Sequence, residues 1–152
     1  MRIKLWASTL IFGTLSLVSS WGQAAEIMDK IIATPAISVA QASYLVFVSS
    51  GKLAEDATQD QSLALLQTLG WLGPGQINRP LKAAEYAYLL TRSYALPGGI
   101  LASLFPGPRY SYRDLVARGV FSAKGDPDAF LTGVEAVRIL GKVMDSLPGA
   151  RS

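Results

Sequence analysis

The stretch "LTGVEAVRILGKV" (residues 131–143) has the pattern of a helix start, and two related stretches precede it. They are "LKAAEYAYLLTRS" (81–93) and, with fewer matching letters, "ISVAQASYLVFVS" (37–49). In each, an aliphatic residue stands four positions before a Glu or Gln, and apolar residues follow at helical spacing. Three copies of one helix start predict three equivalent helices. The aliphatic residues suit a hydrophobic staple at each start; they are Ile37, Leu81 and Leu131.

The predicted helix starts follow the capping-box rule, in which Ser or Thr is followed three residues later by Glu or Gln. Thr132 with Glu135 fits this rule, and Ser38 with Gln41 fits it too. The hydroxyl accepts from the third helical amide, the Glu or Gln accepts from the capping residue's amide, and a cap stabilises by about 1 kcal/mol. The middle copy has Lys82 where the hydroxyl would be. We therefore expect only half a box there.

Helical periodicity, interrupted by Gly and Pro residues that favour turns, divides the rest of the chain into predicted helices and loops. One segment is ambiguous, because "YLVFV" (44–48) is rich in β-branched and aromatic residues and fits a buried strand by composition. The corresponding part of the other two copies has a helical pattern, which favours a helix here. The predicted helices are 26–33, 38–50, 61–71, 82–94, 112–119 and 132–147.

Landmarks in the second half of the chain recur at a nearly constant spacing. The glutamates, the "LPG" stops and the turn glycines are separated by 50, 51 and 49 residues; the pairs are Glu85 and Glu135, Leu96 and Leu147, and Gly70 and Gly119. A fixed spacing is the signature of a repeat protein. The sequence thus predicts an all-α fold of three helix–loop–helix repeats, at 26–53, 60–97 and 111–148.

Residues 1–24 have the layout of a secretory signal peptide. Arg2 and Lys4 form a positive start, an apolar stretch follows, and small residues lead to a cleavage site predicted after Ala24. The alternative is an uncleaved anchor, although the apolar stretch is marginal for crossing a membrane. With cleavage, residues 25–152 form an exported domain, periplasmic or associated with the cell envelope, without a membrane span.

The composition excludes several functional classes. The chain has no Cys, hence no lipoprotein anchor, disulfide or thiol chemistry, and it has no His. No metal or cofactor is therefore expected. Without the 2 basic residues of the leader, 12 of the 14 Lys and Arg residues remain, against 11 Asp and Glu. The domain is therefore almost neutral, and nucleic-acid binding is not expected.

The third copy resembles the repeats of the S-layer homology (SLH) family. In "RDLVARGVFSAKGDPDAFLTGVEAVRIL" (113–140), a short helix ends in a glycine turn, "G-D-x-x-x-F" follows, and a helix starts as in that family's "L-T-R-A-E" motif. The second copy matches at "LLQTLGWL" and "PLKAAEYAYLL", and the first only at its second helix. The resemblance spans 26–147. It implies a pseudo-threefold bundle of three repeats that binds cell-wall polysaccharide or peptidoglycan.

The resemblance also implies a site that this chain lacks. The family's main anion-binding residue is the arginine of its "TRAE" motif, and the three copies have Val39, Ala83 and Gly133 at that position. Losing the bidentate guanidinium weakens the implied grip on a carboxylate-bearing sugar. Lys82 is adjacent and offers a point charge instead.

The segment "PGGILASLFPGPRYSYR" (97–113) is not explained by the repeat. Arg and Tyr together suit sugar stacking, carboxylate contact and protein interfaces. The alternative is a connector that folds its apolar residues onto the bundle. The predicted ligand-binding residues are Lys82, Arg109, Tyr110, Tyr112 and Arg113.

Two kinds of chemistry compete with binding. A small hydrolase would need a paired acid and base, for example Glu85 near Glu135, whereas capping roles for these residues argue against one. Asp126 and Asp128 alone provide too few ligands for a calcium loop. We expect a non-enzymatic envelope module whose partner is cell-wall glycan or, as an adaptor, an envelope protein.

Overall fold

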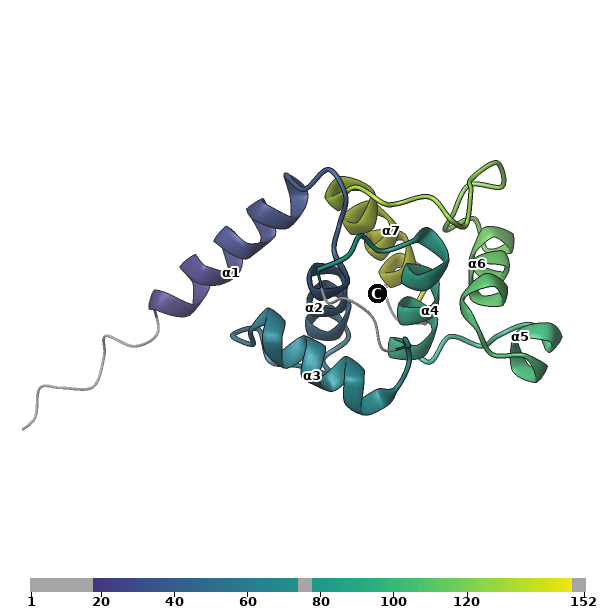
Figure 1. Cartoon of the computed structure of the whole chain (residues 1–152), viewed down its shortest axis with the longest axis horizontal. Coiled ribbons are helices and arrows are strands. Elements are labelled where there is room, and N and C mark those ends of the chain that lie inside the picture. Colours follow the sequence, from purple (N-terminus) through teal and green to yellow (C-terminus); the bar gives the residue numbers. More distant parts are fainter. Residues whose placement is uncertain (1–17, 74–77, 149–152) are drawn as a thin grey trace, which may run out of the picture.

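The computed structural model describes residues 18–73 and 78–148, and this part of the chain is all-α, as predicted (Figure 1). Its only extended pairings are two isolated bridges, Ser38 with Pro80 and Lys82 with Phe130. None of the described helices is long and apolar enough to cross a membrane. The helices are α1 (Val18–Ile32), α2 (Val39–Ser49), α3 (Gln59–Leu69), α4 (Ala83–Ser93), α5 (Ile100–Leu104), α6 (Pro108–Ala117) and α7 (Gly133–Asp145).

The three predicted helix starts form as expected. Ser38 with Gln41 and Thr132 with Glu135 make complete capping boxes at α2 and α7. At α4, Glu85 accepts from the Lys82 amide at 3.1 Å and the lysine side chain caps nothing, so this box is half complete. Residues 44–48 lie inside α2, so the helix interpretation of this segment was right.

Three helix starts differ clearly from the prediction. α1 begins at Val18 instead of residue 26, inside the predicted signal peptide. α3 begins at Gln59 instead of residue 61, because Thr58 and Gln61 form a capping box there. α6 begins at Pro108 instead of residue 112, since proline is pre-organised for the first helical turn. α5 was not predicted at all. The predicted signal peptide lies mainly outside the described residues, and α1 continues across Ala24.

The segments that lead into α2, α4 and α7 are hydrogen-bonded pairwise. The Leu81 amide donates to the Ile37 carbonyl at 2.8 Å, and the Ile37 amide donates to the Leu131 carbonyl at 2.8 Å. A third connection runs from the Ala83 amide to the Ala129 carbonyl at 2.9 Å. These bonds satisfy amides that a helix leaves without partners in its first turn or just before it. The three helix starts are therefore fixed to one another at the backbone.

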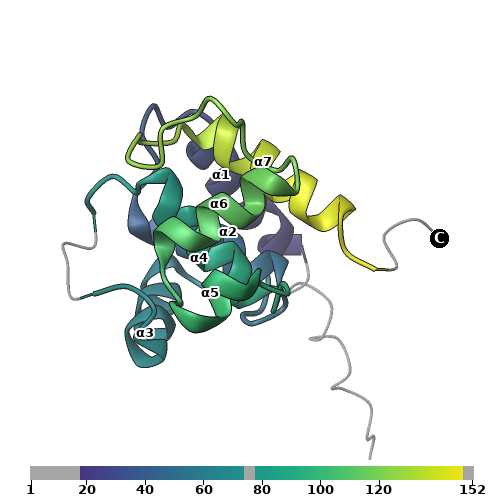
Figure 2. The same cartoon turned by 90° about the vertical axis from the view of Figure 1, so that its right-hand side faces the viewer.

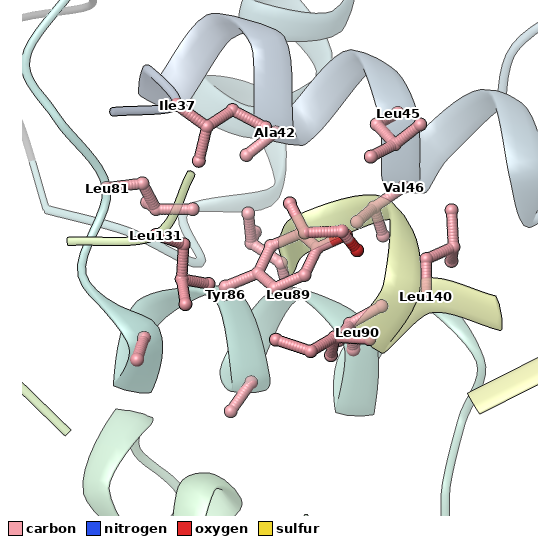
Figure 3. Packing of buried hydrophobic residues seen from close by; sticks show 14 of the residues in the cluster. Ile37, Ala42, Leu45, Val46, Leu81, Tyr86, Leu89, Leu90, Leu131 and Leu140 are labelled. Carbon is pink, nitrogen blue, oxygen red and sulfur yellow. The ribbon is translucent and has the colours of Figure 1, made fainter. Parts of the chain in front are cut away.

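The core lies between α2, α4 and α7 (Figure 3). The three aliphatic residues before the caps converge there: Ile37 and Leu81 are fully buried, and Leu131 is 7% exposed. Tyr86 lies at the centre, and its hydroxyl donates to the Ala136 carbonyl at 2.9 Å across the α4–α7 interface. Burial raises the pKa of Tyr86, so it stays a neutral donor.

Three outer helices each pack against a different helix of the core, and α5 packs on α6. α3 packs on α2, α6 packs on α4, and α1 packs on α7. Figure 2 shows α6 and α5 on the side of α4 that faces the viewer. The connection of α3 to α2 includes a buried hydrogen bond between the Ser43 and Ser62 hydroxyls, 3.2 Å apart. The N-terminal α1 thus contacts the C-terminal α7, although the two are far apart in sequence.

Candidate functional site

A cavity of about 660 Å³ opens at the N-terminal end of α4. It brings together three of the predicted ligand-binding residues, Lys82, Arg109 and Tyr110. The segment 104–110 forms one side, and Asp128 from the loop before α7 forms another. This volume falls in the range of small-molecule sites.

The charged groups of this cavity meet at Asp128. Its carboxylate lies 2.9 Å from Lys82 Nζ and 3.4 Å from an Arg109 guanidinium nitrogen. The hydrogen bond from Lys82, aided by the charges of Lys82 and Arg109, lowers the pKa of Asp128. Two cations share one exposed carboxylate, so the cluster keeps one net positive charge. An anion that enters this cavity can replace Asp128 as the partner of Lys82 or Arg109.

A second ion pair borders the cavity and involves Arg79, which sequence reasoning missed. Arg79 donates to both oxygens of Glu85, at 2.8 and 2.6 Å. Burial raises the pKa of Glu85, but the Arg79 hydrogen bond, the Lys82 amide and the nearby positive charges outweigh it and hold that pKa below its ordinary value. Arg79 stands two residues before Leu81, where the repeated helix start begins, and no motif marked it. Glu85 is therefore an ionised, capped carboxylate.

An aromatic pair supplies the apolar wall of the cavity. The rings of Phe105 and Tyr110 are stacked, with centroids 6.1 Å apart. Asp114 holds the turn before this segment, because its carboxylate accepts from the Gly99 amide at 2.7 Å. Arg118 adds a hydrogen bond to the Pro97 carbonyl. Leu104 and Phe105 are 65% and 60% exposed, so this wall faces solvent.

Tyr112 and Arg113 lie apart from that cavity. Tyr112 is buried and packs on Phe121, with ring centroids 4.8 Å apart. Burial, followed by the charge of Asp126, raises the pKa of Tyr112. Arg113 is exposed on α6 and borders none of the cavities described here. The structure thus brings together Lys82, Arg109 and Tyr110 but not the other two predicted residues.

The positions that correspond to the "TRAE" arginine are buried in all three copies. Val39 and Ala83 are 6% and 3% exposed, and Gly133 is also buried. At Gly133, an added Cβ would overlap the carbonyl oxygen of Ile31, so α7 starts where the end of α1 passes directly over it. No side chain of any length fits there.

The residues proposed for catalysis or calcium have structural partners. Glu135 accepts from the Thr132 amide and hydroxyl, both at 2.9 Å, so it caps α7 as Glu85 caps α4. Asp126 Oδ1 accepts from the Asp128 amide at 2.8 Å in a tight turn. Across residues 18–73 and 78–148 no group of three or more Asp, Glu, His or Cys residues is placed to hold a metal ion.

Comparisons with known proteins give no match to a family model, a curated protein or a solved structure. The chemistry of the cavity is defined by its own geometry: two cations, a shared carboxylate and a stacked aromatic pair. Cations and aromatic faces together suit an anionic ligand with an apolar face.

Proposed function

We propose that the chain is an exported, non-enzymatic module of the cell envelope that binds cell-wall glycan, as the resemblance to the SLH family implies. The site is the cavity at the start of α4. The observation that carries the proposal is the meeting of Lys82, Arg109 and Tyr110 in one exposed cavity. Carboxylate-bearing sugars, as found in peptidoglycan, offer both the negative charge and the C–H faces that such a cavity accommodates.

The proposed architecture is three repeats around a pseudo-threefold axis. The pairwise hydrogen bonds between the segments before α2, α4 and α7 support it, since equivalent residues Ile37, Leu81 and Leu131 take part. Three outer helices support it too, because α1, α3 and α6 each pack on a different core helix. In this arrangement α1, the short helix of the first predicted repeat, packs on α7 of the third repeat.

A binding role is favoured over hydrolysis by the states of the two glutamates. A general acid would need a pKa raised toward neutrality, whereas the pKa of Glu85 is lowered. Glu135 is engaged by the Thr132 cap. Neither carboxylate is placed as the free partner of a paired acid and base.

Pelleting of the purified protein with cell-wall sacculi tests the proposal. We expect the wild type to pellet, and Arg109→Ala or Lys82→Ala to reduce the pelleted fraction several-fold. Arg113→Ala is the matched control, because it removes an exposed arginine from the same helix without touching the cavity. A wild type that stays in the supernatant, or equal losses for Arg109→Ala and Arg113→Ala, would contradict glycan binding at this site.

The exposed apolar tip around α5 favours a second candidate function, an adaptor that binds an envelope protein. Ile100, Leu104 and Phe105 are 82%, 65% and 60% exposed and lie close together in sequence. Exposed apolar residues that cluster mark protein interaction sites. Cross-linking in envelope extracts compares the wild type with Leu104→Ser/Phe105→Ser; a cross-linked product that the variant retains would exclude this surface.

A further inference from the structure

A second cavity, of about 310 Å³, lies beside the C-terminal half of α4. Trp71, Tyr88 and Arg92 line one part of it, and Ser103 and Pro106 from the segment after α4 line another. Pro106 also lines the cavity at the start of α4, so the two cavities meet at this residue. Lys82 and Arg92 are ten residues apart, which corresponds to about 15 Å along the axis of α4.

Arg92 is positioned by aromatic rings. Its guanidinium carbon lies over the Trp71 ring at 5.6 Å from the centroid and over the Tyr88 ring at 6.0 Å. Such contacts use the positive charge but none of the five N–H donors of the side chain. They also reduce the freedom that an exposed arginine would lose on binding a ligand.

The donors of Arg92 have no partner in the part of the chain that the structure describes. There, Arg92 forms no ion pair within 4.0 Å and no hydrogen bond from its side chain. The cavity lining contains no Asp or Glu, in contrast to the first cavity, where Asp128 occupies both cations. Lys52 adds another positive charge at 5.9 Å from the Trp71 ring. The electrostatics of this cavity therefore favour an anion more clearly than those of the first.

The remaining lining residues are small, polar or apolar. The Thr91 and Ser103 hydroxyls donate to the Ala87 and Gly99 carbonyls, which leaves their oxygens as acceptors toward the cavity. Ser111 lines it from α6 and is 3% exposed. The walls thus provide hydroxyl oxygens for sugar hydroxyls, next to an aromatic face and a guanidinium.

We propose that this cavity is a binding site for a carboxylate-bearing sugar, with Arg92 holding the carboxylate and Trp71 contacting the sugar ring. The choice of a sugar rests on the proposed function, whereas the preference for an anion follows from Arg92, whose donors have no partner among the described residues. A planar guanidinium edge matches the two oxygens of a carboxylate. The site is separate from Lys82 and Arg109.

Trp71 provides a direct reporter. The chain has 3 tryptophans, at positions 6, 21 and 71, so the full chain carrying Trp6→Phe and Trp21→Phe fluoresces from Trp71 alone. The probes are sodium glucuronate, glucose and sodium acetate at constant ionic strength. We expect a saturable change in Trp71 emission with glucuronate, and no comparable saturation with glucose, which lacks the charge, or acetate, which lacks the ring.

Substitutions of Arg92 then test whether this residue binds the carboxylate of glucuronate. In the same Trp71-only background, Arg92→Gln is expected to weaken glucuronate binding about 10-fold or more, which is the effect of losing a charged hydrogen-bond pair. Arg92→Lys keeps the charge without the bidentate edge and should weaken binding by a smaller factor. Arg113→Gln, the matched exposed arginine, should leave it unchanged. Unaltered helical circular dichroism confirms that each variant is folded.

Three results would overturn the inference: no saturable response to glucuronate, an equal response to acetate, or equal affinity in the Arg92→Gln variant. Its failure is distinguishable from failure of the proposed function. Arg109→Ala should lose sacculus pelleting and keep the Trp71 response to glucuronate. Conversely, a protein that responds to glucuronate but never pellets with sacculi retains this site and lacks the proposed function.

Discussion

At the scale of the residue, the surroundings of Gly133 leave no room for a side chain at the first position of α7. The backbone of Ile31 occupies the space that a Cβ would need. The Gly133 amide also donates to the Thr34 carbonyl at 2.9 Å, which fastens the end of α1 to the start of α7. Gly133 has a low helix propensity, but its lack of a side chain allows the backbone of Ile31 to pass close to the start of α7.

Gly133→Ala should destabilise the protein by about 1–3 kcal/mol, the usual cost of forcing atoms into a filled space. Gly141 is the control in the same helix, because a Cβ there meets nothing within 4 Å. Gly141→Ala should instead stabilise by about 1 kcal/mol through helix propensity. Urea unfolding of both variants measures this, and a neutral Gly133→Ala would show that α1 does not hold this position.

Glu85 should make the stability depend on acid pH. Because its pKa is lower in the folded protein than its ordinary 4.5, the ionised carboxylate stabilises the fold above that pH. This contribution is lost as the pH falls through the folded pKa. Urea midpoints of the wild type and Glu85→Gln should therefore differ at pH 6, and the difference should shrink as the pH falls below 4.5 and through the folded pKa. Arg79→Gln should lose most of the same dependence; curves that stay parallel into acid would contradict the pairing.

At the scale of the element, the start of α4 combines two demands. A capping hydroxyl would complete the box with Glu85, yet the position holds Lys82, whose ammonium pairs with Asp128 in the cavity. α2, α3 and α7 have complete boxes. Among α2, α3, α4 and α7, only α4 lacks the side-chain half of the capping box. Its N-terminus lies beside the candidate site.

Lys82→Thr should raise the free energy of unfolding by about 1 kcal/mol, because it supplies the missing cap and removes only an exposed ion pair. The same variant should pellet less with sacculi than the wild type. Thr58→Ala, which removes the cap of α3, is the opposite control and should destabilise by about 1 kcal/mol without affecting pelleting. Equal pelleting of Lys82→Thr and wild type would remove Lys82 from the binding site.

At the scale of the whole molecule, α1 joins the N-terminal region to the last helix. Its contribution to the core comes from its C-terminal turns: Ile31 is fully buried, and Ile27 and Met28 pack against the core in part. All three residues follow the predicted cleavage point after Ala24. Cleavage there would therefore leave the packed part of α1 in place (Figure 1).

A chain that starts at Ala25 should be as stable as the full chain, whereas one that starts at Thr34 should lose about 2–5 kcal/mol, the scale for removing a buried aliphatic residue. Urea unfolding of the full chain and the two shortened chains measures these differences in the free energy of unfolding. The mass of the protein recovered after expression in a secreting host reports the cleavage point. Equal stability of the two shortened chains would show that α1 is not part of the fold.

The sequence by itself determined the local structure of the repeated helix starts. Capping residues, staple residues and periodicity act within a few positions, so α2, α4 and α7 and the half box at Lys82 were predictable. The turn glycines Gly51, Gly70 and Gly119 all have positive φ values of 69°, 61° and 75°, as residues without a Cβ readily do. α3 and α6 begin at the local signals Thr58 and Pro108, which lie outside the repeated helix starts.

Only the tertiary structure decided which side chains meet. Arg79 reaches Glu85, Lys82 reaches Asp128 over 46 residues, and Arg92 lies between Trp71 and Tyr88. It also separated Tyr112, which is buried, from its neighbour Tyr110, which lines the first cavity. Such contacts depend on how helices distant in sequence are oriented by a shared core, and no periodicity within one segment encodes that orientation.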